Sequence, residues 1–236
     1  MAAVYPVHIA SPSGLQVQVH TNGSIRRMDY RDILLNLFLG NEIEGGPSNI
    51  YLRRHDTLIS SIPILGPRSP AVFHLDEQGL TACGEWLGIR FTASLVLAAS
   101  AAAWFWHVAL ENTGKATATV DLLYAQDVAL AHYSTVRLNE YYVSQYVDHT
   151  PLTHPERGVV LAVRQNLPIG GRHPWAVMGS LGRGVSFATD ALQFYGLASR
   201  AGQVAVGLTA GQLPATRQQH EHAMVVIQDA PVCLAP

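Results

Sequence analysis

The chain has 236 residues, of which 48% are hydrophobic and 14% are charged, so it can form one large domain with a sizeable core. Its formal net charge of −2 gives no indication of a nucleic acid or an anionic membrane surface as a partner. The two cysteines, Cys83 and Cys233, are far apart in sequence and predict neither a disulfide framework nor a metal site. The first residues, "MAAVYPVHIASPSG", lack the basic region and apolar run of a signal peptide, so we expect a cytoplasmic protein.

Strand-like runs separated by turn residues follow one another along the chain. The run "GLQVQVH" alternates apolar and polar residues, "TNGS" is a hairpin turn, and "IRRMDY" supplies the return strand. Further runs are "DILLNLFLG", "IYLRR", "AVFHL", "TACGEWLGIRF", "TATVDLLYAQDVAL", "GVVLAVRQN", "PWAVMGSL", "GVSFATD", "QVAVGLTAG" and "EHAMVVIQD". Two short stretches, "MDYRDILLNLF" and "ATDALQFYGLA", could be helical. This spacing predicts a β-sandwich, and we expect a single domain over residues 1–236.

Residues 91–110, "FTASLVLAASAAAWFWHVAL", contain no charged side chain and have about the length of a membrane span. Two strands with a turn near Ser100 fit better, because the middle "AASAAA" is only mildly apolar and His107 lies inside. The second strand alternates, with Trp104 and Trp106 on the face opposite His107. We therefore expect no membrane partner.

The usual catalytic and metal-binding patterns are weak here. The sequence "HEH" places His220 and His222 on one face of a strand, which indicates sheet histidines rather than a metal site. Glu42 and Glu44 are formally a carboxylate pair for glycoside chemistry, but two acids on one turn usually belong to a solvated loop. We expect no catalytic residue, no metal and no cofactor.

Several turns carry arginine, and these side chains could hold a phosphate or a carboxylate. The alternative, which we favour, is that they pair with acidic residues at loop ends or at an interface. The residues concerned are Arg53, Arg54, Arg68, Arg172 and the neighbouring His173.

One segment, "RLNEYYVSQYVDHTPLTHPERG" at residues 137–158, combines aromatic rings with carboxylates and carboxamides. That mixture is typical of a sugar-binding surface, where rings meet pyranose faces and polar groups meet hydroxyls. The alternative is an edge strand and loop with tyrosine hydroxyls at the rim. On an extended strand, Tyr142 and Tyr146 would share one side and Tyr141 the other. The candidate substrate-binding residues are Asn139, Glu140, Tyr141, Tyr142, Gln145, Tyr146, Asp148 and His149.

Long stretches of the sequence are similar to a known family. They are "SPSGLQVQVHTNGSIRRMDYRDILLNLFLGNEIEGGPSNIYLRR", "LLYAQDVAL", "VRLNEYYVSQYVDHTPL", "GRHPWAVMGSLGRGVSFATDALQFYG" and "HEHAMVVIQDAP". They resemble the N-terminal β-sandwich of inverting phosphorylases in glycoside hydrolase family 94, most closely the 1,2-β-oligoglucan phosphorylases. "VALENTG" is loosely similar to the galactose-mutarotase-like supersandwich. The resemblance implies an all-β, antiparallel supersandwich.

The resemblance also implies that the catalytic groups lie in another domain. In such enzymes the general acid and the phosphate-binding groups lie in an (α/α)6 barrel, which these 236 residues do not include. We therefore expect an accessory and assembly domain that is inactive alone, contributes to a homodimer interface and to the active-site rim, and meets β-1,2-glucooligosaccharides weakly or through a partner barrel.

Two alternatives remain open. One is a free-standing carbohydrate-binding module that uses the tyrosine-rich face. The other is an epimerase-like enzyme of the supersandwich class, which would need a paired histidine and carboxylate in a cleft.

Overall fold

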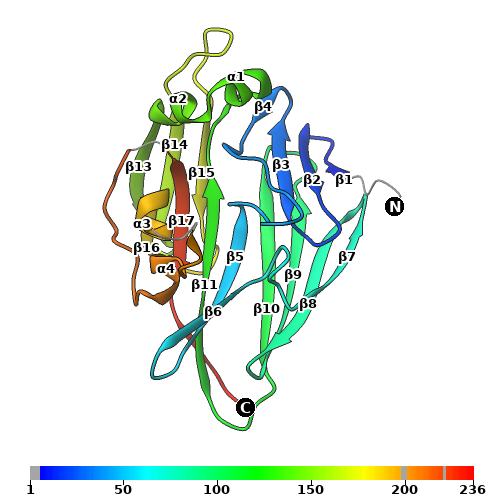
Figure 1. The fold of residues 1–236 in the computed structure, drawn as a ribbon, viewed down its shortest axis with the longest axis vertical. Helices are drawn as coiled ribbons and strands as arrows, with labels where there is room; N and C mark the ends of the chain where they lie inside the picture. Colours follow the sequence, from blue (N-terminus) through cyan, green and yellow to red (C-terminus); the bar gives the residue numbers. More distant parts are fainter. Residues whose placement is uncertain (1–5, 198–200, 220–221) are drawn as a thin grey trace.

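The computed structural model describes residues 6–197, 201–219 and 222–236. Its strands form three sheets that pack face to face around one main core, with a few short helices at the periphery (Figure 1). Strands make up 50% of the structure, which confirms the all-β sandwich that the sequence predicted.

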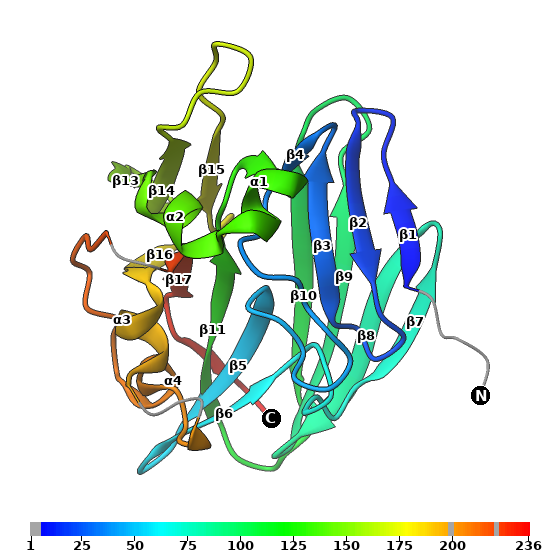
Figure 2. The same ribbon diagram turned by 45° about the horizontal axis from the view of Figure 1, so that its top comes forward.

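The N-terminal half contributes two sheets that lie against each other (Figure 2). The first has the strand order β1-β2-β3-β4-β12 and the second has the order β10-β9-β8-β7. The predicted hairpin around Asn22 is confirmed, because β2 and β3 pair antiparallel across it. The strands of these sheets are β1 Val7–Ala10, β2 Leu15–Val19, β3 Ile25–Tyr30, β4 Ile33–Leu34, β7 Val72–Asp76, β8 Gly79–Trp86, β9 Ile89–Leu97, β10 Trp104–Asn112 and β12 Ala131–His132.

The third sheet, with nine strands, comes mainly from the C-terminal half of the chain and forms the other half of the sandwich. Its main path is β13-β14-β16-β17-β11-β5-β6, while β15 pairs with β14 and β18 pairs with β11. The long strand β11 is shared between neighbours far apart in sequence, since it pairs with both β5 and β17. The strands are β5 Asn49–His55, β6 Ile59–Pro63, β11 Ala118–Asp127, β13 Val147–His154, β14 Gly158–Gln165, β15 Trp175–Gly179, β16 Gly184–Asp190, β17 Ala223–Asp229 and β18 Val232–Leu234.

The helices of the described chain are short. Helix α3 is the one that "ATDALQFYGLA" predicted: the Asp190 carboxylate caps its first turn by accepting from the Leu192 N–H, and Gly196 ends it with a φ of 75°. Two other predictions were wrong. "MDYRDILLNLF" forms β3, β4 and a loop, and "QVAVGLTAG" contains a helical turn, α4. The helices are α1 Tyr133–Leu138, α2 Glu140–Gln145, α3 Ala191–Tyr195 and α4 Val206–Thr209.

The uncharged segment of residues 91–110 forms a hairpin, as predicted. Strands β9 and β10 pair antiparallel from Trp104 opposite Leu97 to Asn112 opposite Ile89. Across residues 6–197, 201–219 and 222–236, no helix has the length and apolar character needed to cross a membrane.

A buried ion pair ties the nine-stranded sheet to α4. Arg53 on β5 donates to both carboxylate oxygens of Asp121 on β11, at 2.7 and 2.5 Å, and also to the backbone carbonyls of Gly207 and Ala210. Neither side chain is exposed to solvent. The expected pairing of arginine with acids is therefore confirmed for Arg53, and also for Arg54, which contacts Asp56 at 2.9 Å.

Candidate functional site

Residues 133–145 form two short helices, so the edge strand considered as an alternative for residues 139–149 begins only at Val147, with β13. Asn139 lies between them in an extended conformation, and its side-chain carbonyl accepts from the Tyr142 N–H at 3.0 Å. This is an N-cap, which satisfies one of the donors that the first helical turn leaves free. Val136 and Val143 are fully buried beneath α1 and α2, against Leu34 and Leu37. Capping and burial of these valines together favour helix over strand.

The two helices present a tyrosine surface, by which we mean Tyr133, Tyr141, Tyr142 and Leu138. The tyrosines are 39%, 43% and 46% exposed, and Leu138 is 86% exposed. Other side chains fix two of these rings: the Arg27 guanidinium lies 4.6 Å from the centre of the Tyr133 ring, and Phe38 meets Tyr141 edge-on at 5.9 Å. Helices α1 and α2 lie at one end of the sandwich (Figure 1).

The tyrosines group as predicted, but on a helix and not on a strand. Tyr142 and Tyr146 lie on one side because they are four residues apart at the end of α2, with ring centres 5.0 Å apart. Tyr141 instead turns towards Phe38.

Most polar members of the predicted set are already engaged in the fold. Glu140 pairs with Arg137, and Asp148 pairs with Arg217 at 2.5 Å. The backbone carbonyl of Gln145 accepts from Gln219, while the Gln145 side chain is exposed. The tyrosine surface therefore offers rings and few uncommitted hydrogen-bonding groups.

His149 is part of the interior. It is 1% exposed, and burial lowers the pKa of its imidazole to about 4, although a hydrogen bond with the Met224 backbone opposes that shift. The ring is therefore neutral at physiological pH and does not lie with the exposed tyrosines.

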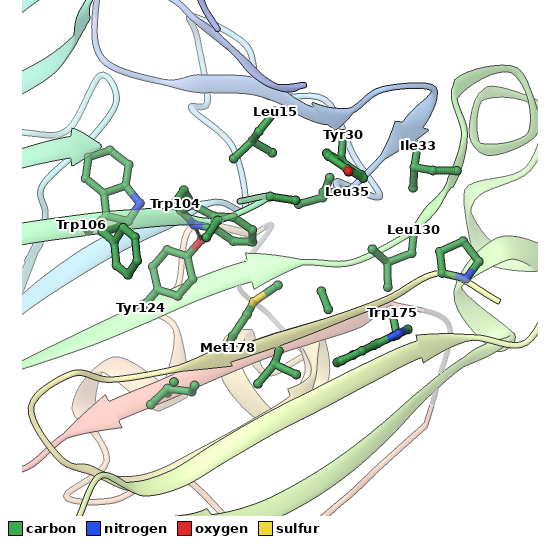
Figure 3. A pocket seen from close by; sticks show the side chains of 18 of the residues that line it. Leu15, Tyr30, Ile33, Leu35, Trp104, Trp106, Tyr124, Leu130, Trp175 and Met178 are labelled. Atoms are coloured by element: carbon green, nitrogen blue, oxygen red, sulfur yellow. Dashed lines mark hydrogen bonds between the residues drawn. The ribbon is translucent and has the colours of Figure 1, made fainter. Parts of the chain in front are cut away.

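A second region, which the sequence did not single out, is a cleft of about 1110 Å³ between the nine-stranded sheet and the two N-terminal sheets. We call it the tryptophan cleft, because three of the four tryptophans of the chain line it. In Figure 3, Leu15, Tyr30 and Ile33 lie on one wall and Trp175 and Met178 on the other, with Trp104 and Tyr124 between them. Its walls comprise Leu15, Tyr30, Arg31, Asp32, Ile33, Leu35, Ile50, residues 102–108, Leu122, Tyr124, Leu130, Ile169, Gly170, residues 172–182, Ile227 and Asp229.

Hydrogen bonds hold the floor of the tryptophan cleft. The Trp104 indole N–H donates to the Tyr124 hydroxyl at 3.2 Å, and that hydroxyl donates to the side-chain Oε1 of Gln126 at 2.9 Å. Burial keeps the pKa of Tyr124 well above its usual value, so the hydroxyl stays protonated. The Trp104 ring is thus fixed from its edge, while the partly buried ring packs against the main core and lines the cleft.

Polar side chains mark the two ends of the cleft along β15. Arg172 and His173 precede this strand, and Ser180 follows it. At the Ser180 end, burial raises the pKa of Asp229, and a hydrogen bond with Ser180 opposes the rise. A ligand along β15 would meet apolar rings in the middle and hydrogen-bonding groups at the two ends, beyond the five residues of the strand, which span about 17 Å.

The cleft could have been anticipated from two sequence signals. Trp104 and Trp106 alternate with polar or smaller residues in the predicted strand, and Trp175 begins the run that became β15. The sequence cannot show that these strands face one another, because β10 and β15 belong to different sheets.

The other candidates from the sequence lie elsewhere. Glu42 contacts His20 at 3.4 Å and Glu44 contacts Asn41, so both carboxylates belong to the structure of their loop. Of the "HEH" sequence, His220 and Glu221 lie outside the described residues, and His222 meets Phe38 with ring centres 4.8 Å apart. Within the described ranges, no three His, Cys, Asp or Glu side chains gather as a metal site would require.

Comparison with known proteins places this fold in a family. A family described as "SOGP N-terminal domain" matches residues 18–236. The chain is 30% identical over 217 residues to a 1,2-beta-oligoglucan phosphorylase of Listeria innocua serovar 6a. That match covers 91% of this chain and 19% of the relative, so the chain spans about a fifth of the relative's length. The chain belongs to the SOGP N-terminal domain family.

Proposed function

We propose that this chain is an accessory and assembly domain of an enzyme that phosphorolyses β-1,2-glucooligosaccharides. The observation that carries the proposal is the 30% identity over 217 residues to a 1,2-beta-oligoglucan phosphorylase that is about five times longer than this chain. The match of residues 18–236 to the SOGP N-terminal domain family supports it. In this proposal the general acid and the phosphate-binding groups come from another domain, and the present domain alone does not catalyse phosphorolysis.

The tyrosine surface is the part of the domain that we assign to contacts with another subunit. Three exposed tyrosines and an exposed leucine on two adjoining helices have the composition of an interface core, since aromatic side chains are enriched there. Asn139, Glu140 and Asp148 support this surface through capping and ion pairs. We propose that it contributes to a homodimer interface and, across it, to the rim of an active site.

A free-standing carbohydrate-binding module is the second candidate. The aromatic walls and polar ends of the tryptophan cleft favour it. The two functions differ in what they require of the tyrosine surface, because a free-standing module would bind sugar without any contribution from it.

Phosphorolysis assays test the absence of catalysis by this domain. The 236-residue chain is incubated with β-1,2-glucooligosaccharides and phosphate, and glucose 1-phosphate is measured. We expect no release above the rate without protein. Release at rates typical of enzymes, about 1 s⁻¹ or faster, would refute the proposal.

Sedimentation tests the assembly role. We expect the chain to self-associate at tens of micromolar, and Leu138→Ala to weaken that association about tenfold, because a central apolar side chain of an interface contributes more than about 1 kcal/mol. Leu192→Ala is the matched control, since Leu192 is also an exposed leucine on a short helix, 45% exposed on α3. If both variants weaken self-association equally, the tyrosine surface is not the contact between subunits, and that part of the proposal is wrong.

A further inference from the structure

We propose that the tryptophan cleft binds a β-linked glucooligosaccharide of several residues. The inference rests on the proposed function for the class of sugar, and on the geometry of the cleft for the site. It assigns ligand binding to residues of β10 and β15, which are distinct from the tyrosine surface.

The arrangement of rings is the first support. Trp104 and Trp106 are two residues apart on β10, so their side chains project from one face about 6.8 Å apart. Trp175 comes from β15 on the opposite wall (Figure 3) and is 68% exposed, which is unusual for so large an apolar side chain. The C–H faces of β-linked glucose rings are apolar, so Trp104 and Trp106 can stack on them inside the cleft. Trp175, which pairs in register with the exposed Arg164, offers a further indole at the mouth of the cleft.

The polar groups are the second support. At one end of β15 the Arg172 guanidinium can donate to hydroxyls, beside His173, whose Nδ1 lies 3.2 Å from the Gln165 backbone carbonyl oxygen. At the other end Ser180 accepts from the Gly182 N–H and bonds to Asp229, and the Asp229 carboxylate can accept further hydrogen bonds from hydroxyls. An apolar peptide or a lipid chain in this cleft would desolvate these groups without replacing their bonds to water, which costs free energy. A ligand with apolar faces and a periphery of hydroxyls satisfies both the rings and the ends.

The size of the cleft is the third support. Pockets for drug-sized ligands measure about 300–1,000 Å³, and this cleft, at about 1110 Å³, lies just above that range. A single glucose would fill only part of it. We therefore expect affinity to rise with the length of the oligosaccharide until the space between the polar ends is filled.

Titration of the 236-residue chain with β-1,2-linked glucooligosaccharides of two to six residues tests the proposal. Calorimetry gives the dissociation constant, and the NMR signals of the indole N–H groups show where the ligand binds. We expect affinity to increase with length, and the indole signals of Trp104, Trp106 and Trp175 to shift while that of Trp86, which lies outside the cleft, stays in place. Glucose alone and the β-1,4-linked series show whether length and linkage are recognised.

Two variants locate the site. Trp175→Ala is expected to weaken binding about tenfold, the upper end of what one aromatic contact contributes. It should leave the fold intact, because that side chain is largely exposed. Tyr142→Ala is the control on the tyrosine surface and should bind like the original chain.

The outcomes separate this inference from the proposed function. No binding by the hexasaccharide at millimolar concentration, or loss of binding in Tyr142→Ala but not in Trp175→Ala, overturns the cleft as a glucan site. Neither result touches the phosphorolysis and sedimentation tests, so the accessory role can stand without the cleft. Shifts of the same indole signals on protein dilution, without sugar, would identify the cleft as a contact between copies of the chain and would also overturn the inference.

Discussion

The tyrosine surface and the tryptophan cleft use similar side chains in opposite ways. On the tyrosine surface the rings stand outwards on two short helices, and the neighbouring Asn139, Glu140 and Asp148 are bonded within the fold. In the cleft the rings come from two sheets and line a concave space, with polar side chains at its ends. Exposed rings on short helices suit a protein contact, whereas rings that line a concave space suit a small ligand.

The two regions also depend on different anchors. The loop beneath the tyrosine surface is held by Asp127 at the end of β11: its carboxylate accepts from the backbone N–H groups of Leu37 and Phe38 at 2.9 and 2.5 Å, and from Asn36 at 3.1 Å. The cleft depends on the line of hydrogen bonds from Trp104 through Tyr124 to Gln126. The two anchors touch, because the Gln126 side-chain amide also donates to the Asp127 carboxylate at 3.3 Å. Each can still be changed by a variant that leaves the main partners of the other in place.

Removing the Asp127 carboxylate should have the largest effect. Asp127→Ala leaves two backbone N–H groups and the Asn36 amide without their acceptor in a buried place, at about 1–3 kcal/mol for each unsatisfied group. We expect the free energy of unfolding, measured with urea, to fall by about 3–5 kcal/mol. Phe38 would lose its position against Tyr141, so self-association should weaken as well.

In this variant the cleft serves as the internal control. The Trp175 indole signal should keep its position while signals of α1 and α2 change. Loss of the cleft signals in the still-folded protein would show that the two regions are not independent.

The pH dependence of stability should reveal two buried groups with opposite signs. His149 has a folded-state pKa of about 4, so between pH 6.5 and 4 the unfolded chain binds the proton and stability falls as the pH is lowered. Burial raises the pKa of Asp127 to about 7, although the surrounding N–H donors oppose the rise. The Asp127 carboxyl therefore stays protonated to a higher pH in the folded chain than in the unfolded chain, and stability falls as the pH is raised from about 4 to 7. The contribution amounts to about 3 kcal/mol for His149 and about 4 kcal/mol for Asp127 across their windows.

Single variants separate the two contributions. With His149→Gln, the free energy of unfolding should decrease as the pH rises from 4 to 7, because the Asp127 contribution alone remains. With Asp127→Asn, it should increase over the same interval until about pH 6.5. Denaturant titrations at four or five pH values measure both slopes. Parallel curves for the two variants would contradict the assignment.

The sequence predicted more of the sheets than of the candidate sites. Alternation and turn residues sufficed for the hairpins β2–β3 and β9–β10, because their pairing is local. The segment at residues 133–145 was misread because its aromatic residues favour strands, whereas Asn139 as a cap and burial of Val136 and Val143 decided for helix. The cleft could not be predicted, since it depends on the approach of β10 and β15 from separate sheets.

Tyr124→Phe tests the anchor of the cleft with a smaller change. Removing the hydroxyl takes a partner from the Trp104 indole N–H and from the buried Gln126 carbonyl oxygen, at a cost of about 1–2 kcal/mol in stability. We expect the Trp104 indole signal to move and the affinity for the oligosaccharide to fall a few-fold. Self-association should stay unchanged. This is the reverse of the pattern expected for Asp127→Ala, which weakens self-association and leaves the cleft in place. A change in self-association equal to that of Leu138→Ala would contradict the separation of the two regions.

The smallest effect is expected on the tyrosine surface itself. Tyr142→Ala removes the ring contact with Tyr146, whose centre lies 5.0 Å away, and such a contact contributes about 0.5–1.5 kcal/mol. Because Tyr142 is nearly half exposed, we expect the lower end of that range in urea unfolding. Asn139 still caps α2 in this variant through the backbone N–H of residue 142, so the helix itself should persist. If stability instead falls as far as in Asp127→Ala, the ring is part of the core and not of a contact surface. A small loss of stability together with clearly weaker self-association is the result that an exposed ring at an interface requires.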